Sequence, residues 1–516
     1  MTKRISYLLL LAISLLLTSL PAGAQSQMVG VIVNEDSAFE GYTLFAPKHY
    51  TMTYLIDNDG QIVNSWESDY EPGQSVYLLE NGHLLHTSLW GAERNPTFSG
   101  GGEGGRVEEY DWDGNLIWEF DYSSDKYMSH HDIEPLPNGN ILLIAFEYKT
   151  VEEAIAAGRN PNLLSDGALW PDSVIEIEPT LPVGGNIVWE WHVWDHLVQD
   201  YDSSKANYGI VGDHPELIDV NFWAEAGQAH ANWNHVNSID YNAELDQIMI
   251  SVRGFSEIWI IDHSTTTTEA AGHTGGRSNK GGELLYRWGN PMAYRAGDSS
   301  DQKLFDQHDS QWIETGLPGE GNILIFNNGN QRGYSSADEI APPVDNDGNY
   351  TLETGAAYGP SEQVWVYTAP NKTDLFSEAI SGVQRLPNGN TLICNGVNGI
   401  FIEVTSSGEI VWQYVNPIID TGPLAEGETV PLDHRGHALN AVFKIHRYAP
   451  DYVGLQGHDL TPSVLVEDSD GATRENATPG GGGNDSPPRS QEDEGNNAPP
   501  PPQGGDRDNP PPPNNG

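Results

Sequence analysis

The chain alternates short apolar runs with tight-turn residues over most of its length. One segment shows the pattern clearly, because Gln311–Glu314 runs in, Thr315–Gly321 turns, and Asn322–Asn327 runs back. Apolar runs on both sides of a glycine-containing turn predict a β-hairpin. Helical spacing is rare, and we expect a short helix at Val151–Gly158. The pattern therefore predicts an all-β protein.

Two short units repeat through the body of the chain. The first is an Asp/Gly turn with an aromatic strand, at Asp57–Trp66, Asp111–Phe120, Gly185–Trp191, Gly282–Trp288, Glu362–Tyr367 and Ser407–Tyr414. The second is an Asn-Gly-type hairpin, at Leu79–His83, Leu136–Asn140 and Leu386–Asn390, with looser copies at Asp240–Leu245 and Leu317–Asn322. Two hairpins make a four-stranded sheet. Six such sheets in a ring predict a six-bladed β-propeller, whose closure leaves few exposed strand edges.

One polar position recurs ahead of the second unit. In regular copies it lies seven residues before the turn asparagine, and in the fourth copy it precedes a longer turn. The set is Gln74, His131, His235, His308, Ser381 and, less regularly, His437. The innermost strands of a propeller line its channel, so these residues should form a ring at the channel mouth. A single histidine is usually structural, but four in one register favour a functional site.

Two arginines end return strands beside this predicted ring. Arg253 closes the third hairpin and Arg332 closes the fourth, so each should lie near the histidine of its own blade. A guanidinium group suits sulfate, phosphate or carboxylate oxygens. The alternative is an ordinary salt bridge to Asp309 or Asp240.

Composition narrows the range of functions. The 516 residues include 74 acidic and 24 basic side chains, a formal net charge of −50. This balance argues against nucleic-acid binding, which needs clustered lysine and arginine. A lone cysteine, Cys394, cannot form an internal disulfide and lies in an apolar run, so we expect it to be buried.

The two ends of the chain differ from the body. Residues 1–24 resemble a signal peptide, with Lys3 and Arg4, an apolar run over Ile5–Leu20 and small residues at Ala22–Ala24. The alternative is a membrane anchor, but the run is short, and no later segment is long enough to span a bilayer. We therefore expect an exported protein, periplasmic or secreted. Residues 25–466 should be the propeller, and 467–516 a disordered acidic tail rich in Pro, Gly and Asn.

Several motifs together resemble those of bacterial arylsulfotransferases (aryl-sulfate sulfotransferases). They are Gly41–Pro47, the Leu-Pro-Asn-Gly-Asn repeats, His235–Ile239, Arg287–Pro291 and the hairpin from His308 to Asn327–Arg332. The resemblance implies an exported six-bladed propeller that moves a sulfuryl group from a phenolic sulfate ester to a phenol. It also implies a sulfohistidine intermediate, with no nucleotide sulfate donor, no cofactor and no metal.

The resemblance also suggests roles for individual residues. His308 would be the nucleophile or sulfuryl ligand, His235 and His437 the acid and base, and Arg332 the clamp on the sulfuryl oxygens. The residues His131, Arg253, Gln74, Ser381 and Asn328 would bind substrate. The fifth blade departs from the family pattern, because Ser381 stands where a histidine is expected. Sulfate-ester binding or hydrolysis therefore remains an alternative to transfer.

Other classes of site are also open. A calcium-stabilised or non-catalytic binding propeller would use the turns at Asp57, Asp111 and Asp345, although ordinary turn chemistry explains them as well. His130 and His131 could ligate a metal, but adjacent strand residues face opposite ways. The glycine-rich stretch Gly100–Gly105 lacks the features of a phosphate-binding loop and is expected to be a plain loop.

Overall fold

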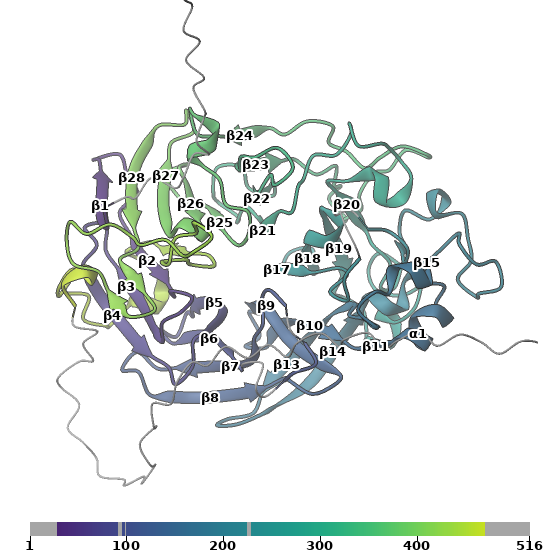
Figure 1. Cartoon of the computed structure of the whole chain (residues 1–516), viewed down its shortest axis with the longest axis horizontal. Coiled ribbons are helices and arrows are strands. Elements are labelled where there is room, and N and C mark those ends of the chain that lie inside the picture. The colour runs from purple at the N-terminus through teal and green to yellow at the C-terminus, as the bar shows by residue number, and fades with distance from the viewer. Residues whose placement is uncertain (1–27, 91–94, 99, 224–228, 470–516) are drawn as a thin grey trace, which may run out of the picture. The chain divides into compact units, whose positions relative to one another are not determined.

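The computed structural model describes residues 28–90, 95–98, 100–223 and 229–469, which form a six-bladed β-propeller (Figure 1). Each blade is an antiparallel sheet whose strands follow one another outward from the channel. The predicted signal peptide and most of the predicted tail lie outside the described residues. The described chain reaches Ser469, slightly past the boundary expected from composition, and both Glu467 and Ser469 are buried.

In the first three blades the strands follow chain order from the channel outward. The first blade holds β5 (Pro72–Leu78), β6 (Leu84–Leu89), β7 (Gly105–Tyr110) and β8 (Leu116–Asp121). The second holds β9 (Tyr127–Pro135), β10 (Ile141–Glu147), β13 (Asp172–Pro179) and β14 (Gly185–His192). The third holds β17 (Val236–Asn242), β18 (Gln247–Val252), β19 (Glu257–Asp262) and β20 (Tyr286–Trp288).

The remaining blades draw on both ends of the described chain. The fourth holds β21 (His308–Trp312), β22 (Ile323–Asn327), β23 (Ser336–Ile340) and β24 (Trp365–Tyr367). The fifth holds β25 (Gly382–Arg385), β26 (Thr391–Asn395), β27 (Ile400–Val404), β28 (Ile410–Val415) and β1 (Gly30–Asn34). The sixth holds β31 (His446–Tyr448), β2 (Tyr42–Phe45), β3 (Met52–Ile56) and β4 (Ile62–Glu67).

Two strand pairings close the ring. The late strand β31 pairs with the early strand β2, with Tyr448 opposite Tyr42. The early strand β1 adds to the outer edge of β28, with Gly30 opposite Val415. The ring is therefore held shut by backbone hydrogen bonds between the two ends of the described chain.

The recurring tryptophans explain the first repeat unit. In every blade the fourth strand from the channel carries a tryptophan. Its indole N–H donates a hydrogen bond to a carbonyl group in an outer turn of the next blade. The six donor–acceptor pairs are Trp66–Asp111 (2.9 Å), Trp118–Gly184 (2.7 Å), Trp191–Gly282 (2.7 Å), Trp288–Pro360 (2.8 Å), Trp365–Ser406 (3.1 Å) and Trp412–Asn58 (2.8 Å). Each indole buries apolar surface while its polar edge is satisfied, so the repeat links consecutive blades around the ring.

Aspartates link the inner strands in a similar way. Asp132 accepts from the backbone N–H of Ile239 in the third blade (3.2 Å). In turn, Asp240 accepts from Trp312 in the fourth blade (2.6 Å), and Asp309 accepts from Val383 in the fifth (2.8 Å). Bonds from backbone donors to carboxylates are among the stronger hydrogen bonds, so they fix the register of neighbouring blades at the channel.

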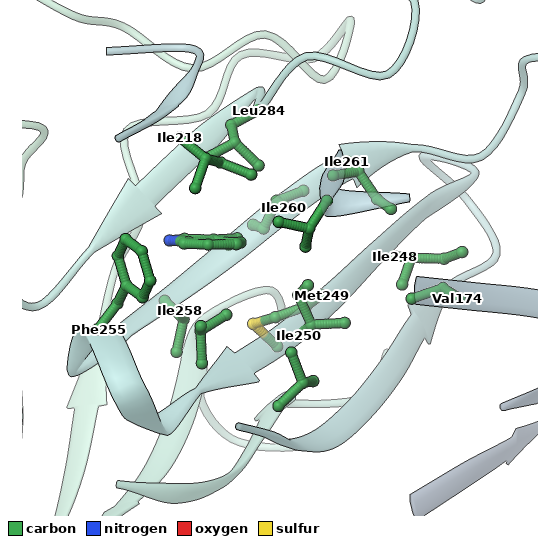
Figure 2. Close-up of a cluster of buried hydrophobic side chains, with 14 of the residues drawn as sticks. Val174, Ile218, Ile248, Met249, Ile250, Phe255, Ile258, Ile260, Ile261 and Leu284 are labelled. Carbon is green, nitrogen blue, oxygen red and sulfur yellow. The ribbon is translucent and has the colours of Figure 1, made fainter. Parts of the chain in front are cut away.

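The core fills the spaces between blades. Figure 2 shows one cluster, in which Ile248, Met249 and Ile250 of β18 pack with side chains of β19 and of neighbouring segments. These three consecutive residues are fully buried, so β18 is covered on both faces, as a strand sandwiched between blades must be. Cys394 of β26 is also fully buried, as predicted.

Helix is scarce, as the sequence predicts. The expected helix is α1 (Val151–Ala156), which begins with a capping box between Thr150 and Glu153. A second short helix, α2 (Thr267–Ala270), was not predicted. The insertions and loops also carry short strands, namely β11 (Lys149–Thr150), β12 (Ala168–Leu169), β15 (Leu197–Val198), β16 (Ile218–Asp219), β29 (Ile418–Ile419) and β30 (Gly422–Pro423). Over the described ranges, no helix is both long and apolar enough to cross a membrane.

Candidate active site

The predicted ring position has an unusual backbone. Gln74, His131, His235 and Ser381 all have positive φ values, of 138°, 51°, 51° and 92°. In the first three blades the pairing register also shifts beside them, which marks β-bulges in the innermost strands. In the fourth blade Asp309 carries the kink, with φ of 48°, so His308 stands one residue earlier. A bulge redirects side chains, and strained backbone of this kind is concentrated at functional sites.

Three of the four predicted histidines come together at the channel. The rings of His131 and His235 lie 4.9 Å apart, centroid to centroid. Phe443 joins them to the third, since its ring lies 6.0 Å from His131 and 6.5 Å from His308. Burial lowers the pKa of His131 well below its usual value, and the positive charges available to His235, His130 and His308 lower it further. The three imidazoles therefore stay neutral at physiological pH and share one electrostatic environment.

His131 is the terminus of a chain of hydrogen bonds that the sequence did not reveal. Nε2 of His130 lies 2.7 Å from Oδ1 of Asp172, and Nδ1 of His130 lies 2.8 Å from Nδ1 of His131. If His130 donates its Nε2 proton to the carboxylate, its Nδ1 must accept the Nδ1 proton of His131. That assignment leaves a lone pair on Nε2 of His131, where the described residues place no hydrogen-bond partner.

This arrangement corrects one expectation. We expected His130 and His131 to face opposite ways, as neighbours on a regular strand do. The positive φ of His131 breaks that alternation and brings the two rings into contact, with centroids 5.1 Å apart. The repeat in the sequence located His131 correctly. It did not reveal the β-bulge that turns the His131 ring towards His130, because the bulge is a property of the folded backbone.

His308 has no free nitrogen. Asn328 directs its amide nitrogen to the carbonyls of Ser377 (2.8 Å) and Ile380 (3.0 Å), so its Oδ1 faces Nδ1 of His308 at 2.8 Å. The Nδ1 atom must then carry the proton. The Nε2 lone pair accepts the backbone N–H of Ile380 at 3.2 Å. Burial lowers the pKa of His308 to about 3. In this arrangement His308 cannot be the attacking nucleophile, contrary to the sequence-based expectation.

The cations of the site are Lys48 and Arg253. Both lower the pKa of His308, which places their charges near the imidazoles, and Arg253 also lowers the pKa of His235. Arg253 lies 3.8 Å from Asp306. Burial lowers the pKa of Lys48, and no described carboxylate lies within ion-pair distance of its ammonium group. Sequence reasoning missed Lys48, although it directly follows the Gly41–Pro47 motif that carries the family resemblance.

Arg332 is placed differently from the prediction. Its guanidinium donates to the hydroxyl of Ser336 (2.7 Å) and the carbonyl of Asn327 (3.3 Å) and stacks over Phe305 and Tyr334. In the described structure no hydrogen bond or ion pair joins it to His308. The hairpin does return to the same end of the sheet, but the loop after β22 turns the side chain back onto its own blade.

His437 contacts none of the three clustered histidines in the described structure. Its ring is about half exposed and faces Glu378 (3.4 Å) and Asp433 (3.4 Å). The inner strand of the sixth blade is β31, and Phe443 takes the place beside the histidines. The alignment failed here because β31 closes the ring with β2, so no hairpin turn follows it to anchor the register.

Ser381 and Gln74 occupy ring positions, but only Gln74 has a side-chain atom without a hydrogen-bond partner among the described residues. The Ser381 hydroxyl lies 2.9 Å from that of Ser377 and accepts the N–H of Gly396, also at 2.9 Å. It is fully buried, so it supports the backbone of the fifth blade and cannot replace the missing histidine. Gln74 is buried with Oε1 unpaired among the described atoms, which leaves an acceptor free at the first blade.

The glycine-rich stretch covers the histidines. Gly102 accepts the N–H of His131 through its carbonyl (2.8 Å), and a Cβ added at Gly102 would overlap the imidazole ring of His131. A Cβ at Gly101 would lie 3.6 Å from Cε1 of His235. The prediction of a plain loop therefore missed its role, because glycine is needed where the backbone passes directly over the imidazoles.

The aspartate turns serve the fold. In each, Oδ1 of the first aspartate accepts from backbone N–H groups of its own turn, at Asp57, Asp111 and Asp345. This is the turn chemistry that the alternative explanation predicted. Over residues 28–90, 95–98, 100–223 and 229–469, no group of three or more His, Cys, Asp or Glu is arranged to hold a metal ion.

Three solved structures that resemble this chain are distant from it in sequence. A protein of unknown function from Bacteroides caccae has a TM-score of 0.42 and 12% identity, over 79% of this chain and 98% of the other. A periplasmic gluconolactonase from Pseudomonas aeruginosa has a TM-score of 0.37 and 10% identity, over 80% of this chain and 100% of the other. A streptogramin B lyase has a TM-score of 0.35 and 10% identity, over 83% and 96%. These similarities carry no argument about function.

A comparison with curated proteins finds no significant match. The comparison with protein families gives a definite result, since the family described as Arylsulfotransferase (ASST) matches residues 29–422. This range covers most of the chain, including His131, His235 and His308. The chain therefore belongs to the arylsulfotransferase (ASST) family, which indicates a sulfotransferase acting on small molecules.

Proposed function

We propose that the protein is an exported arylsulfotransferase that moves a sulfuryl group from a phenolic sulfate ester to a phenol through a sulfohistidine, without a nucleotide sulfate donor. The observation that supports this most strongly is the meeting of three neutral imidazoles with Lys48 and Arg253. Neutral imidazole is a nucleophile, and paired cations suit the sulfuryl oxygens. The family match supports the reaction class.

The geometry favours His131 as the nucleophile. Its Nε2 lone pair attacks sulfur, an N–S bond forms, and the S–O bond to the aryl group breaks. The proton on Nδ1 of His131 passes to Nδ1 of His130, and Asp172 balances the resulting positive charge. The hydrogen-bonded chain thus makes the attacking nitrogen more nucleophilic, as the base and orienting group do in other nucleophilic enzymes.

The second proton of the reaction is assigned to Lys48. Its ammonium group protonates the leaving phenolate, and the resulting amine deprotonates the acceptor phenol. Burial lowers the pKa of Lys48 towards that of a phenol, which suits transfer in both directions. The acceptor oxygen then attacks sulfur, the N–S bond breaks, and the proton returns from His130 to His131. Charge and protons balance over the two half-reactions.

The neighbouring groups hold the sulfuryl group and the aryl leaving group. Arg253 and Lys48 supply positive charge to the sulfuryl oxygens. His235 contacts Asn232 through Nδ1 at 2.8 Å, and if the Asn232 amide nitrogen donates, Nε2–H of His235 can donate to the ester oxygen. His308 forms one wall of the site, and hydrogen bonds with Asn328 and Ile380 hold it in place.

Export is part of the same proposal. Residues 1–24 carry the charged, apolar and small-residue regions of a signal peptide, in a sequence that has a single cysteine and needs no disulfide. Expression with the native N-terminus in a Gram-negative host, followed by N-terminal sequencing of periplasmic protein, tests it. Recovery of the uncleaved chain in the cytoplasm alone would refute export.

The test of sulfuryl transfer uses 4-nitrophenyl sulfate as donor and phenol as acceptor. We expect nitrophenol release that depends on phenol, and one sulfuryl group on a peptide that contains His131 when the acceptor is left out. His437→Ala is the matched control, because that histidine is about half exposed and is paired with Glu378 and Asp433. Failure to release nitrophenol, or a sulfuryl group on another residue, would contradict the assignment.

Hydrolysis is the second candidate, and the fifth blade favours it. Ser381 provides no imidazole there, and its hydroxyl is fully engaged. A sulfohistidine with one fewer imidazole around the acceptor could be attacked by water. Release of inorganic sulfate at the same rate with and without phenol would identify a hydrolase in place of a transferase.

A further inference from the structure

A second cavity opens at the other end of the channel. It has a volume of about 770 Å³ and lies at the hairpin-turn ends of the inner strands. Glu134, Asp240 and Glu314 line it, together with Tyr448 and Tyr452. None of the three clustered histidines contributes to its lining. The cavity is therefore separate from the candidate active site.

A charged layer closes the floor of this cavity. Nζ of Lys444 lies 2.8 Å from Oδ2 of Asp132 and 3.3 Å from Oδ1 of Asp309, and Tyr77 donates its hydroxyl to Asp132 (2.8 Å). Lys444 and Asp309 face the cavity, whereas the preceding residues, Phe443 and His308, belong to the histidine cluster. Consecutive residues beside the channel thus face its opposite ends.

The carboxyl groups of Glu134 and Asp240 have no ion-pair partner among the described residues. The Glu134 carboxyl group forms no hydrogen bond or ion pair with any described residue, and that of Asp240 accepts from the backbone N–H of Trp312. Burial raises the pKa of Asp240 to about 7 and raises that of Glu134 well above its usual value, and the negative charge of Asp240 raises the latter further. Glu314 and Asp132 add negative charge on the same side.

The nearby cations are already used. Lys444 is shared between two carboxylates, so this layer keeps a net negative charge. Arg385 pairs with Glu339 (2.6 Å), and Arg447 pairs with Glu403 (2.6 Å). The cavity therefore presents uncompensated carboxyl groups inside a concave surface, where a field is focused by low-dielectric walls.

The walls of the cavity are partly apolar and aromatic. The rings of Tyr448 and Tyr452 lie 4.8 Å apart, and Leu79, Leu136 and Leu317 also line the cavity. The His446 ring lies 4.8 Å from that of Tyr77, and its Nε2 is buried with no hydrogen-bond partner among the described atoms. Mixed walls of this kind suit an organic ligand with an apolar body, and the described residues lack a grouping suited to a metal ion.

We infer that this cavity binds a small organic cation, an amine with an apolar body, whose ammonium group lies beside Glu134 and Asp240 and whose body contacts the tyrosine and leucine walls. Aromatic faces attract ammonium groups as well as apolar surface. Binding replaces the protons that the buried carboxyls otherwise hold, so affinity increases as pH rises through the titration of the pair. The site is independent of the proposed sulfuryl transfer.

Calorimetric titration with benzylamine, and with benzyl alcohol as its uncharged counterpart, tests the inference on the full chain at about pH 8, where benzylamine is still largely protonated. We expect benzylamine to bind at least about tenfold more tightly than the alcohol, because only the amine offers a charge to the carboxyls. Glu134→Gln and Asp240→Asn should each weaken amine binding about tenfold.

Two controls keep the test decisive. Glu409→Gln, at an exposed position outside the cavity, should leave binding unchanged. Glu134→Gln removes an unpaired carboxyl, so it should fold normally and melt no lower than the parent protein. The inference is overturned if benzylamine gives no binding heat, if the alcohol binds equally well, or if Glu134→Gln and Glu409→Gln behave alike.

Discussion

The second and fourth blades place a histidine in equivalent inner strands, yet the two imidazoles are prepared for different tasks. His131 gives its Nδ1 proton to a relay through His130 to Asp172, which leaves Nε2 with a lone pair. His308 is bonded at both nitrogens, by Asn328 and by the backbone of Ile380. Equivalent positions in a repeat therefore share a location, whereas the hydrogen-bond partners decide which of them is reactive.

The largest expected effect separates the two histidines directly. His131→Asn should lower the transfer rate about 10³–10⁴-fold, because the nucleophile is lost while a residue that tolerates positive φ is kept. His308→Asn should lower the rate no more than about tenfold, but it should cost about 1–3 kcal/mol of stability by unpairing buried groups. Steady-state kinetics and thermal melts measure both. The opposite order of rate losses would reverse our assignment.

The covering glycine gives the next largest effect. In Gly102→Ala the new methyl group would displace the imidazole of His131, and a shift of about 1 Å at a reacting group costs about 10²-fold in rate. Gly114→Ala is a matched control, because both glycines have φ of 86° while Gly114 has open space around it. Backbone strain is thus equal in the two variants. Equal activities would show that the loop does not set the position of His131.

The relay provides a smaller effect. Asp172→Asn should lower the rate of sulfohistidine formation about 10-fold to 10²-fold, since partners behind a reactive histidine typically contribute this much. Rapid-quench measurement of the first half-reaction would detect it. His308 does not contact Asp172, so the His308 bonds should be unaffected. A variant that forms the intermediate at the parental rate would exclude the relay.

The smallest expected effect is that of pH on the rate of sulfohistidine formation. Burial lowers the pKa of His131 well below 6.5, so the nucleophile stays neutral as the pH falls from about 8 to about 6. The rate of sulfohistidine formation should therefore remain level over that range. A fall in rate with a midpoint near the ordinary histidine pKa would show that the attacking imidazole is solvated, which would contradict the assignment of the buried His131.

Sequence patterns were sufficient for the scaffold because they are local. Each tryptophan strand and each Asn-Gly turn is a signal of a few residues, and the structure shows what the repetition means, from Trp66 to Asp111 and from Trp412 to Asn58. The register of the ring was also readable wherever a hairpin turn follows the inner strand. The prediction of the register was wrong at His437, because the sixth blade is completed by the other end of the described chain.

The reactive groups were less accessible to sequence reasoning because they depend on contacts between distant segments. Lys48 and His131 lie in different blades, and the partner of His130 is Asp172 on another strand. Arg332 looked suitable by spacing, but loop geometry turns it towards Ser336. Spacing predicts which end of a sheet a residue reaches, and it does not predict the direction of a long, flexible side chain.

The sequence by itself determined a closed ring of six antiparallel blades, because hydrophobic alternation and turn chemistry act over a few residues and are written in order along the chain. Only the tertiary structure decided which imidazole keeps a free lone pair, which cations stand beside it, and that the channel carries a second, acidic cavity. These properties arise from burial and from hydrogen bonds between residues far apart in sequence, so they exist only once the ring has closed.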